Sequence, residues 1–363
     1  MTIPLDPAHL PPLPERGGPA QPLLSVRNLR KYFRVAGGLL ARNAQQVHAV
    51  DGVSFNLAKG ETLGIVGESG CGKSTTARVI ARLLRADSGE MIFDGEGVAE
   101  YGGMALRDYR RNLQMVFQDS FASLNPRLSA LESIAYGPRV HGLSRKDARL
   151  RARDLLERVG LSADQFGVRY PKELSGGQRQ RVNIARALAF EPKLLILDEA
   201  VAALDKSVQA QVLNLLQDLK AERGLTYLFI SHDLHVVHYL ADRVLVMYLG
   251  QVVEIGPVTA LYTRARHPYT RALLSAVPSM DPAYRTERSP LAGDPPNPID
   301  PPSGCRFHDR CPSAMPVCAA QAPLLRESES GHWAACHLDD AALTDAMADN
   351  AASGKPQSGP VTP

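Results

Sequence analysis

The stretch Leu63-Gly-Ile-Val-Gly67-Glu-Ser-Gly-Cys-Gly-Lys-Ser74 decides the fold of this chain, because a short apolar strand runs directly into the pattern G-x-x-x-x-G-K-S/T. In such a loop, glycines let backbone N–H groups surround phosphates, Lys73 adds a positive charge, and Ser74 offers a hydroxyl to Mg²⁺. The helix expected over 75–84 points its positive end at the same place. We therefore predict a nucleotide phosphate site made by Gly67, Glu68, Ser69, Gly70, Cys71, Gly72, Lys73, Ser74 and Thr75.

A second motif, Leu194-Leu-Ile-Leu-Asp198-Glu199, places two carboxylates at the end of an apolar strand. Ligands of open α/β sheets bind at the carboxyl ends of strands. Asp198 is suited to the shell of a magnesium ion, and Glu199 to polarising the attacking water as a general base. Taken alone, such a pair could also simply begin a loop.

Composition limits the class of protein. Apolar residues make up 44% of the chain, enough for a real core, and the net charge is only +3, from 41 Lys and Arg against 38 Asp and Glu. We expect no nucleic-acid partner, because such proteins carry a strongly basic face. No stretch reaches the roughly 20 apolar residues that cross a bilayer, and no signal-peptide core follows Met1. The chain is expected in the cytosol unless a partner holds it at a membrane.

Patterning along the chain indicates an α/β fold. One helix is predicted to start at Ser144 and stop at Gly160, and another, with an apolar stripe from Val208 to Leu219, to end near Gly224. The apolar runs at 194–197 and 225–230 do not alternate, which favours strands buried on both faces of a parallel sheet, whereas 24–29 alternates like a half-buried strand. Strands are predicted at 24–29, 47–57, 62–66, 194–197 and 225–230, with a hairpin over 244–254.

The sequence Leu174-Ser-Gly-Gly-Gln178-Arg-Gln-Arg181 resembles the signature of ABC-type ATPases. It lies between the phosphate loop and the acidic strand, which is the order of motifs in an ABC nucleotide-binding domain. The resemblance covers roughly residues 24–338. It implies a P-loop ABC fold with a RecA-like core, an antiparallel β subdomain and an α-helical subdomain at about 120–185, and it implies ATP and Mg²⁺ as cofactors.

The resemblance also assigns further residues. Gln118 is similar to the glutamine that meets Mg²⁺ and the membrane partner, and His232 to the switch histidine that contacts the γ-phosphate, beside the catalytic Glu199 and Lys73. Asp205 falls in the D-loop. Phe33 takes the position of an aromatic that stacks on adenine. Tyr32 is the alternative for that role, and Phe33 could instead be a core aromatic.

In the family the signature acts on the nucleotide of a second subunit, so a working site needs two chains. The trans contacts implied here are Ser175, Gly176, Gly177 and Gln178. Permeases are expected to dock near Gln118 and Phe121–Pro126. The chain departs from the family pattern at two positions, since Ala200 replaces the usual proline and Ala202 the usual serine. We still predict an active ATPase, with altered coupling between the two sites.

A narrower resemblance is carried by Ser123-Leu-Asn-Pro126, His267-Pro-Tyr-Thr-Arg-Ala-Leu273 and the ending Pro298-Ile-Asp-Pro-Pro-Ser-Gly-Cys305-Arg-Phe-His-Asp-Arg-Cys311-Pro. These are similar to the ATPases of peptide and nickel importers with an oligopeptide-type C-terminal extension. The resemblance implies a paralogous second ATPase, two integral-membrane permeases, an extracytoplasmic substrate-binding protein, and a place on the cytoplasmic face of a bacterial inner membrane. The alternatives are a soluble ABC ATPase outside transport and a degenerate regulatory cassette.

Four cysteines gather near the C-terminus, at Cys305, Cys311, Cys318 and Cys336. A cytosolic protein keeps thiols reduced, so the cluster favours a metal over disulfides. The spacing is not that of a zinc ribbon, and four thiolates on irregular chain suit an iron–sulfur cluster. Some relatives with this extension carry a 4Fe–4S cluster. Zinc, with His332 or His337, and plain packing remain the alternatives.

The predicted organisation has four parts. A proline-rich leader spans 1–23, the ATPase domain 24–277, the cysteine-bearing extension 278–338, and a frayed tail 339–363.

Overall fold

The fold comes from a computed structural model, which describes residues 21–35, 45–98, 104–276, 296–329 and 331–338. The tail predicted over 339–363, and all of the predicted leader except 21–23, lie outside these described residues.

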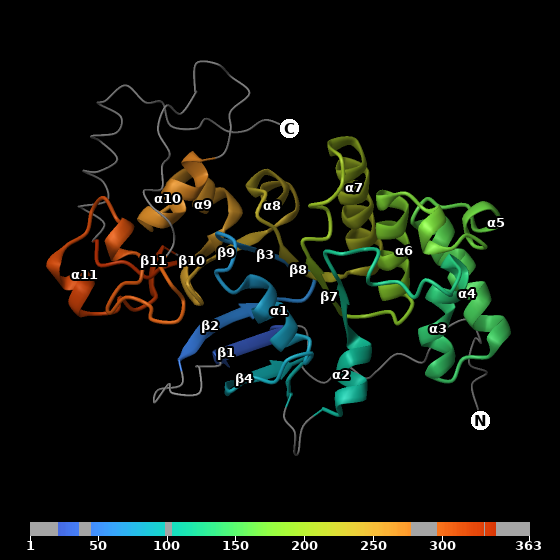
Figure 1. Cartoon of the computed structure of the whole chain (residues 1–363), viewed down its shortest axis with the longest axis horizontal. Coiled ribbons are helices and arrows are strands. Elements are labelled where there is room, and N and C mark those ends of the chain that lie inside the picture. The colour runs from blue at the N-terminus through green and yellow to red at the C-terminus, as the bar shows by residue number, and fades with distance from the viewer. Residues whose placement is uncertain (1–20, 36–44, 99–103, 277–295, 330, 339–363) are drawn as a thin grey trace.

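An eight-stranded sheet forms the centre of the molecule (Figure 1), in the order β11-β12-β10-β9-β3-β8-β7-β6. Five neighbouring strands run parallel, and the other three continue the sheet antiparallel from β9. The parallel strands are β6 (Leu113–Val116), β7 (Leu194–Asp198), β8 (Thr226–Ile230), β3 (Thr62–Val66) and β9 (Arg243–Tyr248). The antiparallel strands are β10 (Gln251–Pro257), β12 (His332–Ala334) and β11 (Arg326–Glu329).

Both faces of β7 and β8 are buried, as their unbroken apolar sequences predicted. Leu195 and Leu197 of β7 join one hydrophobic cluster with the helices α3 to α8. Leu194 and Ile196 join the other cluster, with α1 (Lys73–Ile80) and a second sheet. That antiparallel sheet has the order β2-β1-β4-β5, from β1 (Leu24–Arg34), β2 (Gln46–Leu57), β4 (Ser88–Phe93) and β5 (Glu96–Gly97). Helix α1 was predicted to reach residue 84, but the chain leaves the helical conformation at Arg82, where φ is 54°.

A group of helices lies at one end of the molecule, on the right of Figure 1. It holds α3 (Ala130–Val140), α4 (Arg145–Arg158), α5 (Ala163–Phe166) and α6 (Gly176–Leu188). The predicted start of α4 is confirmed, because Ser144 Oγ accepts a hydrogen bond of 3.1 Å from the Asp147 amide. The remaining helices of the core are α2 (Leu106–Asn112), α7 (Lys206–Arg223) and α8 (Leu234–Leu240). Helix α7 ends at Gly224 in the left-handed conformation, as predicted.

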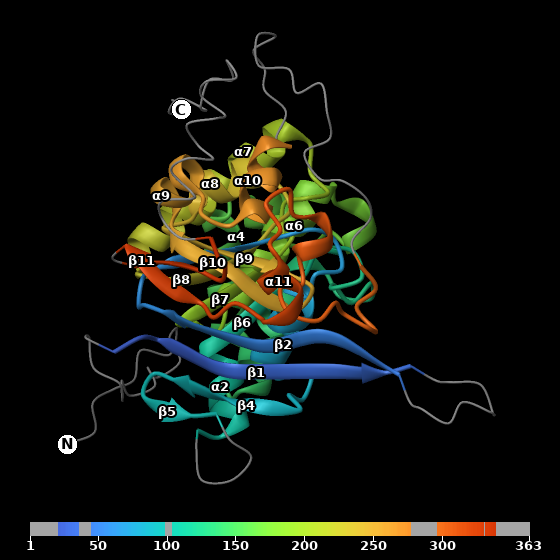
Figure 2. The same cartoon turned by 90° about the vertical axis from the view of Figure 1, so that its left-hand side faces the viewer.

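The C-terminal segment continues the central sheet, since β12 pairs with β10 through Ile255 and Trp333. Figure 2 shows the strand β11 of this segment at the edge of the sheet, near β10. Short helices flank these strands: α9 (Val258–Arg264), α10 (Pro268–Ser275), a 3₁₀ turn η3 (His308–Arg310) and α11 (Pro316–Ala320). The boundary predicted at 278 falls outside the described residues.

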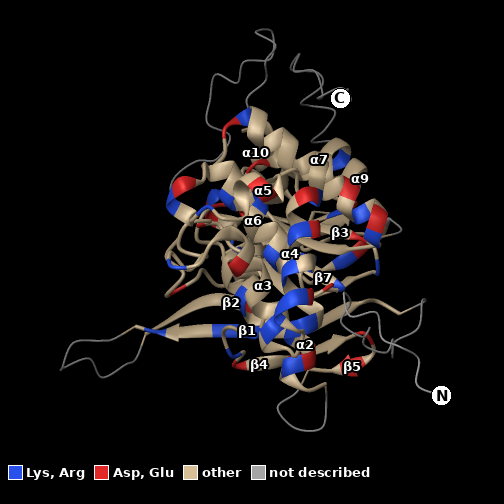
Figure 3. Ribbon diagram, turned by 90° about the vertical axis from the view of Figure 1, so that its right-hand side faces the viewer, with Lys and Arg blue, Asp and Glu red and all other residues tan. Residues whose placement is uncertain are grey.

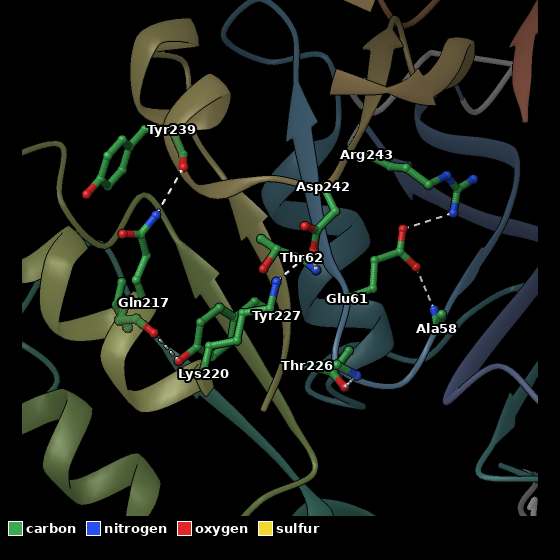
Figure 4. A network of polar contacts seen from close by, with 12 residues as sticks. Ala58, Glu61, Thr62, Gln217, Lys220, Thr226, Tyr227, Tyr239, Asp242 and Arg243 are labelled. Carbon is green, nitrogen blue, oxygen red and sulfur yellow. Dashed lines mark hydrogen bonds and ion pairs between the residues drawn. The ribbon is translucent and has the colours of Figure 1, made fainter. Parts of the chain in front are cut away.

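A polar network closes the amino ends of β3 and β8 (Figure 4). Asp242 accepts from the Thr62 amide and from Lys220 Nζ, each at 2.7 Å. Glu61 accepts from the Ala58 amide at 2.7 Å and pairs with Arg243 at 3.0 Å. These contacts fix the ends of the strands opposite to the phosphate loop.

Charges of both signs share the face that carries α2 and α4 (Figure 3). Arg158 pairs there with Asp154 and Glu222. Within the described ranges, no helix is both long and apolar enough to cross a membrane.

Candidate nucleotide site

The phosphate loop links β3 to α1 through positions that only glycine fits. Gly67 has a φ of 149° and Gly72 a φ of 107°. A Cβ on Gly67 would lie 2.2 Å from the Met247 carbonyl oxygen, and one on Gly72 would lie 2.1 Å from that of Ala49. The loop therefore combines a glycine-only backbone with close packing against β2 and β9.

Lys73 lies beneath this loop. Its ammonium donates to the carbonyls of Gly67 at 2.7 Å and Glu68 at 2.9 Å. Cys71 is buried, with its sulfur 3.7 Å from Lys73 Nζ. Burial raises the pKa of Cys71, which keeps the thiol neutral and agrees with a packing role.

Ser74 of α1 contacts Asp198 at the carboxyl end of β7, with the Ser74 hydroxyl donating to Asp198 Oδ1 at 2.8 Å. Burial raises the pKa of Asp198, while the hydrogen bond from Ser74 opposes that shift. A hydroxyl and a carboxylate are oxygen ligands of the kind that Mg²⁺ prefers, so the pair fits the predicted ion.

Glu199 occupies the centre of the site. Its carboxylate accepts from Gln118 Nε2 at 2.7 Å and lies 3.5 Å from His232 Nδ1. Its backbone is in the left-handed region, with a φ of 49°, and its amide bonds the Ile230 carbonyl at 2.9 Å. A non-glycine residue held in this conformation stores strain, which concentrates at functional positions. The structure thus brings together three predicted residues from three separate loops.

The predicted trans residues lie elsewhere. Ser175 caps α6, with its Oγ accepting from the Gln178 amide at 3.3 Å, while the Gln178 side chain accepts from the Ser175 amide at 2.9 Å. Asp205 likewise caps α7 by accepting from the Val208 amide at 3.0 Å. Figure 1 shows α6 well to one side of α1, with β7 between them.

The two candidates for adenine stacking differ in their contacts. The Tyr32 hydroxyl donates to Asp51 at 2.5 Å, and its ring packs on His48 with centroids 4.4 Å apart. The Phe33 side chain is 38% exposed, with Lys31 Nζ 5.5 Å from its ring. Phe33 is the more exposed of the two aromatic residues.

The C-terminal segment makes two further contacts that the sequence did not predict. Arg310 pairs with Glu68 of the phosphate loop, and His332 Nε2 lies 2.8 Å from the buried Glu254 carboxylate. Neither contact could be predicted from a local sequence pattern, because the two partners are 242 residues apart in the first contact and 78 in the second.

The four cysteines of the extension line one cavity together with His337. The cavity is about 10 Å³, room for about one water molecule. Burial raises the pKa of Cys305 to about 11 and also raises those of Cys311 and Cys336, so these thiols are neutral. In the described part of the chain, no group of three or more His, Cys, Asp or Glu is arranged to hold a metal ion. The predicted centre is therefore not supported, and His332, one suggested zinc ligand, instead faces Glu254.

Comparison with known proteins decides the family. Residues 50–202 match the ABC transporter family, and residues 253–318 match the C-terminal region of oligopeptide/dipeptide transporters. The chain is 51% identical over 320 residues to a protein named as a peptide import ATP-binding protein of Brucella ovis, covering 88% of this chain and 98% of the relative. The chain belongs to the ABC transporter ATP-binding proteins.

Other matches agree. The oligopeptide transport ATP-binding protein AppF of Bacillus subtilis is 50% identical over 321 residues, covering 87% of this chain and 97% of AppF. A solved ATP-binding cassette, a post-hydrolysis dimer bound to ADP and phosphate, superposes with a TM-score of 0.57 at 30% identity, covering 65% of this chain and 98% of that one. This ABC ATPase therefore has the predicted fold, and its relatives favour a transporter subunit over an ATPase outside transport.

Proposed function

We propose that the chain hydrolyses MgATP as half of a two-cassette dimer and so drives the import of di- or oligopeptides through partner permeases. The observation that carries the proposal is the position of Glu199, whose carboxylate lies between Gln118 and His232 at the carboxyl end of β7. The peptide substrate is carried over from the names of the relatives and from the match over 253–318.

The residues supply positioning and charge, which dominate catalysis of phosphoryl transfer. Glu199 accepts a proton from the attacking water, and Gln118 and His232 orient its carboxylate. Lys73 and the amides of the phosphate loop balance the charge of the γ-phosphate. Ser74, Asp198 and Gln118 would hold Mg²⁺, which neutralises phosphate charge when bound.

The second half of the site comes from another subunit, a paralogous ATPase. Ser175, Gly176, Gly177 and Gln178 form the amino end of α6, where amides and the helix dipole suit an anion. Asp205 would meet the partner at the same interface, and Phe33 would stack on adenine.

The segment that follows Gln118 is hydrogen-bonded to α6, the helix that begins at the signature, so a movement of Gln118 would be transmitted to that helix. Asn183 of α6 donates to the Ser120 carbonyl at 3.0 Å, and Arg186 donates to the Ser123 carbonyl. Phe121 in this segment is 51% exposed and offers an apolar contact. The segment is suited to a permease, which would hold the chain at the cytoplasmic face of a bacterial inner membrane. An extracytoplasmic binding protein would deliver substrate to that permease.

Peptide uptake by the complete transporter in vesicles tests the proposal. With ATP inside, a labelled peptide should accumulate, and Lys73→Ala should abolish both ATP binding and uptake. ATP hydrolysis without uptake of any peptide would contradict the proposal that peptides are the transported substrate.

For the four cysteines, we keep the 4Fe–4S cluster as a proposal, with zinc as its rival. Its support is that all four cysteines line the same space, although that space as it stands would have to widen to hold a cluster. Protein purified without oxygen should contain iron and sulfide, with a visible absorption band that Cys311→Ser removes. Colourless, iron-free protein would contradict the cluster.

A further inference from the structure

The C-terminal segment reaches the phosphate loop through an ion pair. Arg310, in the turn η3, donates from both terminal guanidinium nitrogens to Glu68, from Nη1 to Oε2 at 2.8 Å and from Nη2 to Oε1 at 3.0 Å. Two parallel charge-assisted bonds fix orientation as well as distance. The Arg310 side chain is 6% exposed and that of Glu68 is 22% exposed, so solvent screens this pair less than a surface pair.

The backbone of Glu68 is held as well. Its amide donates to the Tyr269 hydroxyl at 2.8 Å, and Tyr269 is fully buried. The Tyr269 ring packs on Tyr248 and on Phe307, with centroids 4.6 Å and 5.4 Å away. Phe307 precedes Arg310 by one turn and is 1% exposed. The same turn therefore supports both contacts of Glu68.

The turn itself is firmly anchored. The Arg310 amide bonds the Phe307 carbonyl at 3.0 Å, and the Cys305 amide bonds the Cys318 carbonyl at 2.7 Å. Arg306 donates to Asp51 of β2 and to the Leu249 carbonyl after β9. A side chain presented by such a base can hold a loop in one shape.

We infer that Arg310 is a positioning residue for ATP binding, and that the C-terminal segment is a structural part of the nucleotide site. Glu68 directly precedes the run of amides over 69–73 that the proposed function assigns to phosphate, and the inference rests on that function. A loop tethered at Glu68 has fewer shapes to give up when the nucleotide binds. Arg310 touches neither ATP nor water in this role; it acts through Glu68.

Substitution Arg310→Gln in the assembled transporter tests the inference. The Kd of a fluorescent ATP analogue and the KM for ATP should rise about tenfold, while kcat changes less than about twofold. The matched control is Arg326→Gln, an exposed arginine of the same segment, which should leave KM unchanged. A lower melting temperature with unchanged KM and Kd would overturn the inference.

A double-mutant cycle shows whether Arg310 acts through Glu68. Glu68→Gln alone should raise KM about as much as Arg310→Gln, and the double variant should be no worse than either. Additive effects would overturn the inference. If Arg310→Gln fails to fold, Glu68→Gln decides, because it leaves Phe307 and its packing in place. Failure of the unmodified transporter to bind ATP would instead overturn the proposed function itself.

Discussion

The two ends of the same strands of the central sheet are built differently. At the amino ends, polar groups satisfy one another, as Asp242 does for the Thr62 amide and Lys220. At the carboxyl ends, Glu199 is held in a left-handed conformation with φ of 49°, and Gly67 bends through a φ of 149°. The left-handed backbone at Glu199 sets the geometry of a side chain proposed for chemistry, whereas ion pairs and hydrogen bonds at the opposite ends hold the strands together.

Glu199→Gln tests the catalytic end with the largest expected effect. The amide keeps the size and contacts of the side chain but accepts a proton poorly, so kcat for ATP should fall about a thousandfold. ATP-bound dimers should accumulate, measured by size-exclusion chromatography with ATP. Unchanged turnover would show that another group acts as the base.

His267→Asn tests how acid lowers the stability of the fold through the buried histidine at the start of α10. Burial lowers the pKa of His267 to about 4, and its Nδ1 accepts from the Tyr269 amide at 3.1 Å. Between pH 6.5 and 4 the unfolded chain binds a proton that the folded chain does not, so stability falls as pH falls. From pH 7 to pH 5, this histidine should remove about 2 kcal/mol from the free energy of unfolding.

Asparagine at this position still caps α10 but does not titrate. In urea unfolding at the two pH values, His267→Asn should lose less stability than the parent on acidification. An identical loss would assign the acid sensitivity to other groups.

Asp242→Ala probes the amino ends. It leaves the buried Thr62 amide without its partner, which should cost about 2 kcal/mol of stability. Asp242→Asn keeps an acceptor and serves as the matched control, with a smaller loss. Urea unfolding measures both. A large fall in kcat with Asp242→Ala would contradict the claim that the amino ends of the strands serve stability and the carboxyl ends serve catalysis.

Two helix caps give the smallest effects and separate local structure from function. Ser144→Ala and Ser175→Ala each remove a capping hydroxyl, so each should cost about 1 kcal/mol of stability in thermal unfolding. Only Ser175→Ala should also lower ATP hydrolysis by the dimer, because Ser175 is proposed to face the partner's nucleotide. Equal hydrolysis by the two variants would count against that role.

The sequence predicted the features that rest on local chemistry. The phosphate loop follows from its glycines, and β7 with Asp198 and Glu199 follows from an apolar run that ends in carboxylates. Strand, cap and stop signals likewise placed α4 and α7. The cysteines crowd into one short segment of the sequence, and the structure places all four around one cavity, but in the described residues they do not form the metal-holding group predicted from them.

Contacts between distant segments left no such signal. Neither Arg310 nor Glu68 is unusual in its own surroundings, and the pair exists only because the extension folds back onto the phosphate loop. The pairing of β12 with β10 is equally non-local, since three residues of β12 carry no strand pattern of their own. The roles of Gln118, His232 and Phe33 came from family resemblance, and they stay predictions until they are tested.

One paired measurement tests the central claim most directly: kcat for ATP and the free energy of unfolding, determined for Glu199→Gln and Asp242→Ala against the parent chain. We expect a crossed result, in which Glu199→Gln loses hydrolysis but keeps its stability, while Asp242→Ala loses stability but keeps its hydrolysis under folding conditions. Loss of both properties in both variants, or full hydrolysis by Glu199→Gln, would contradict it.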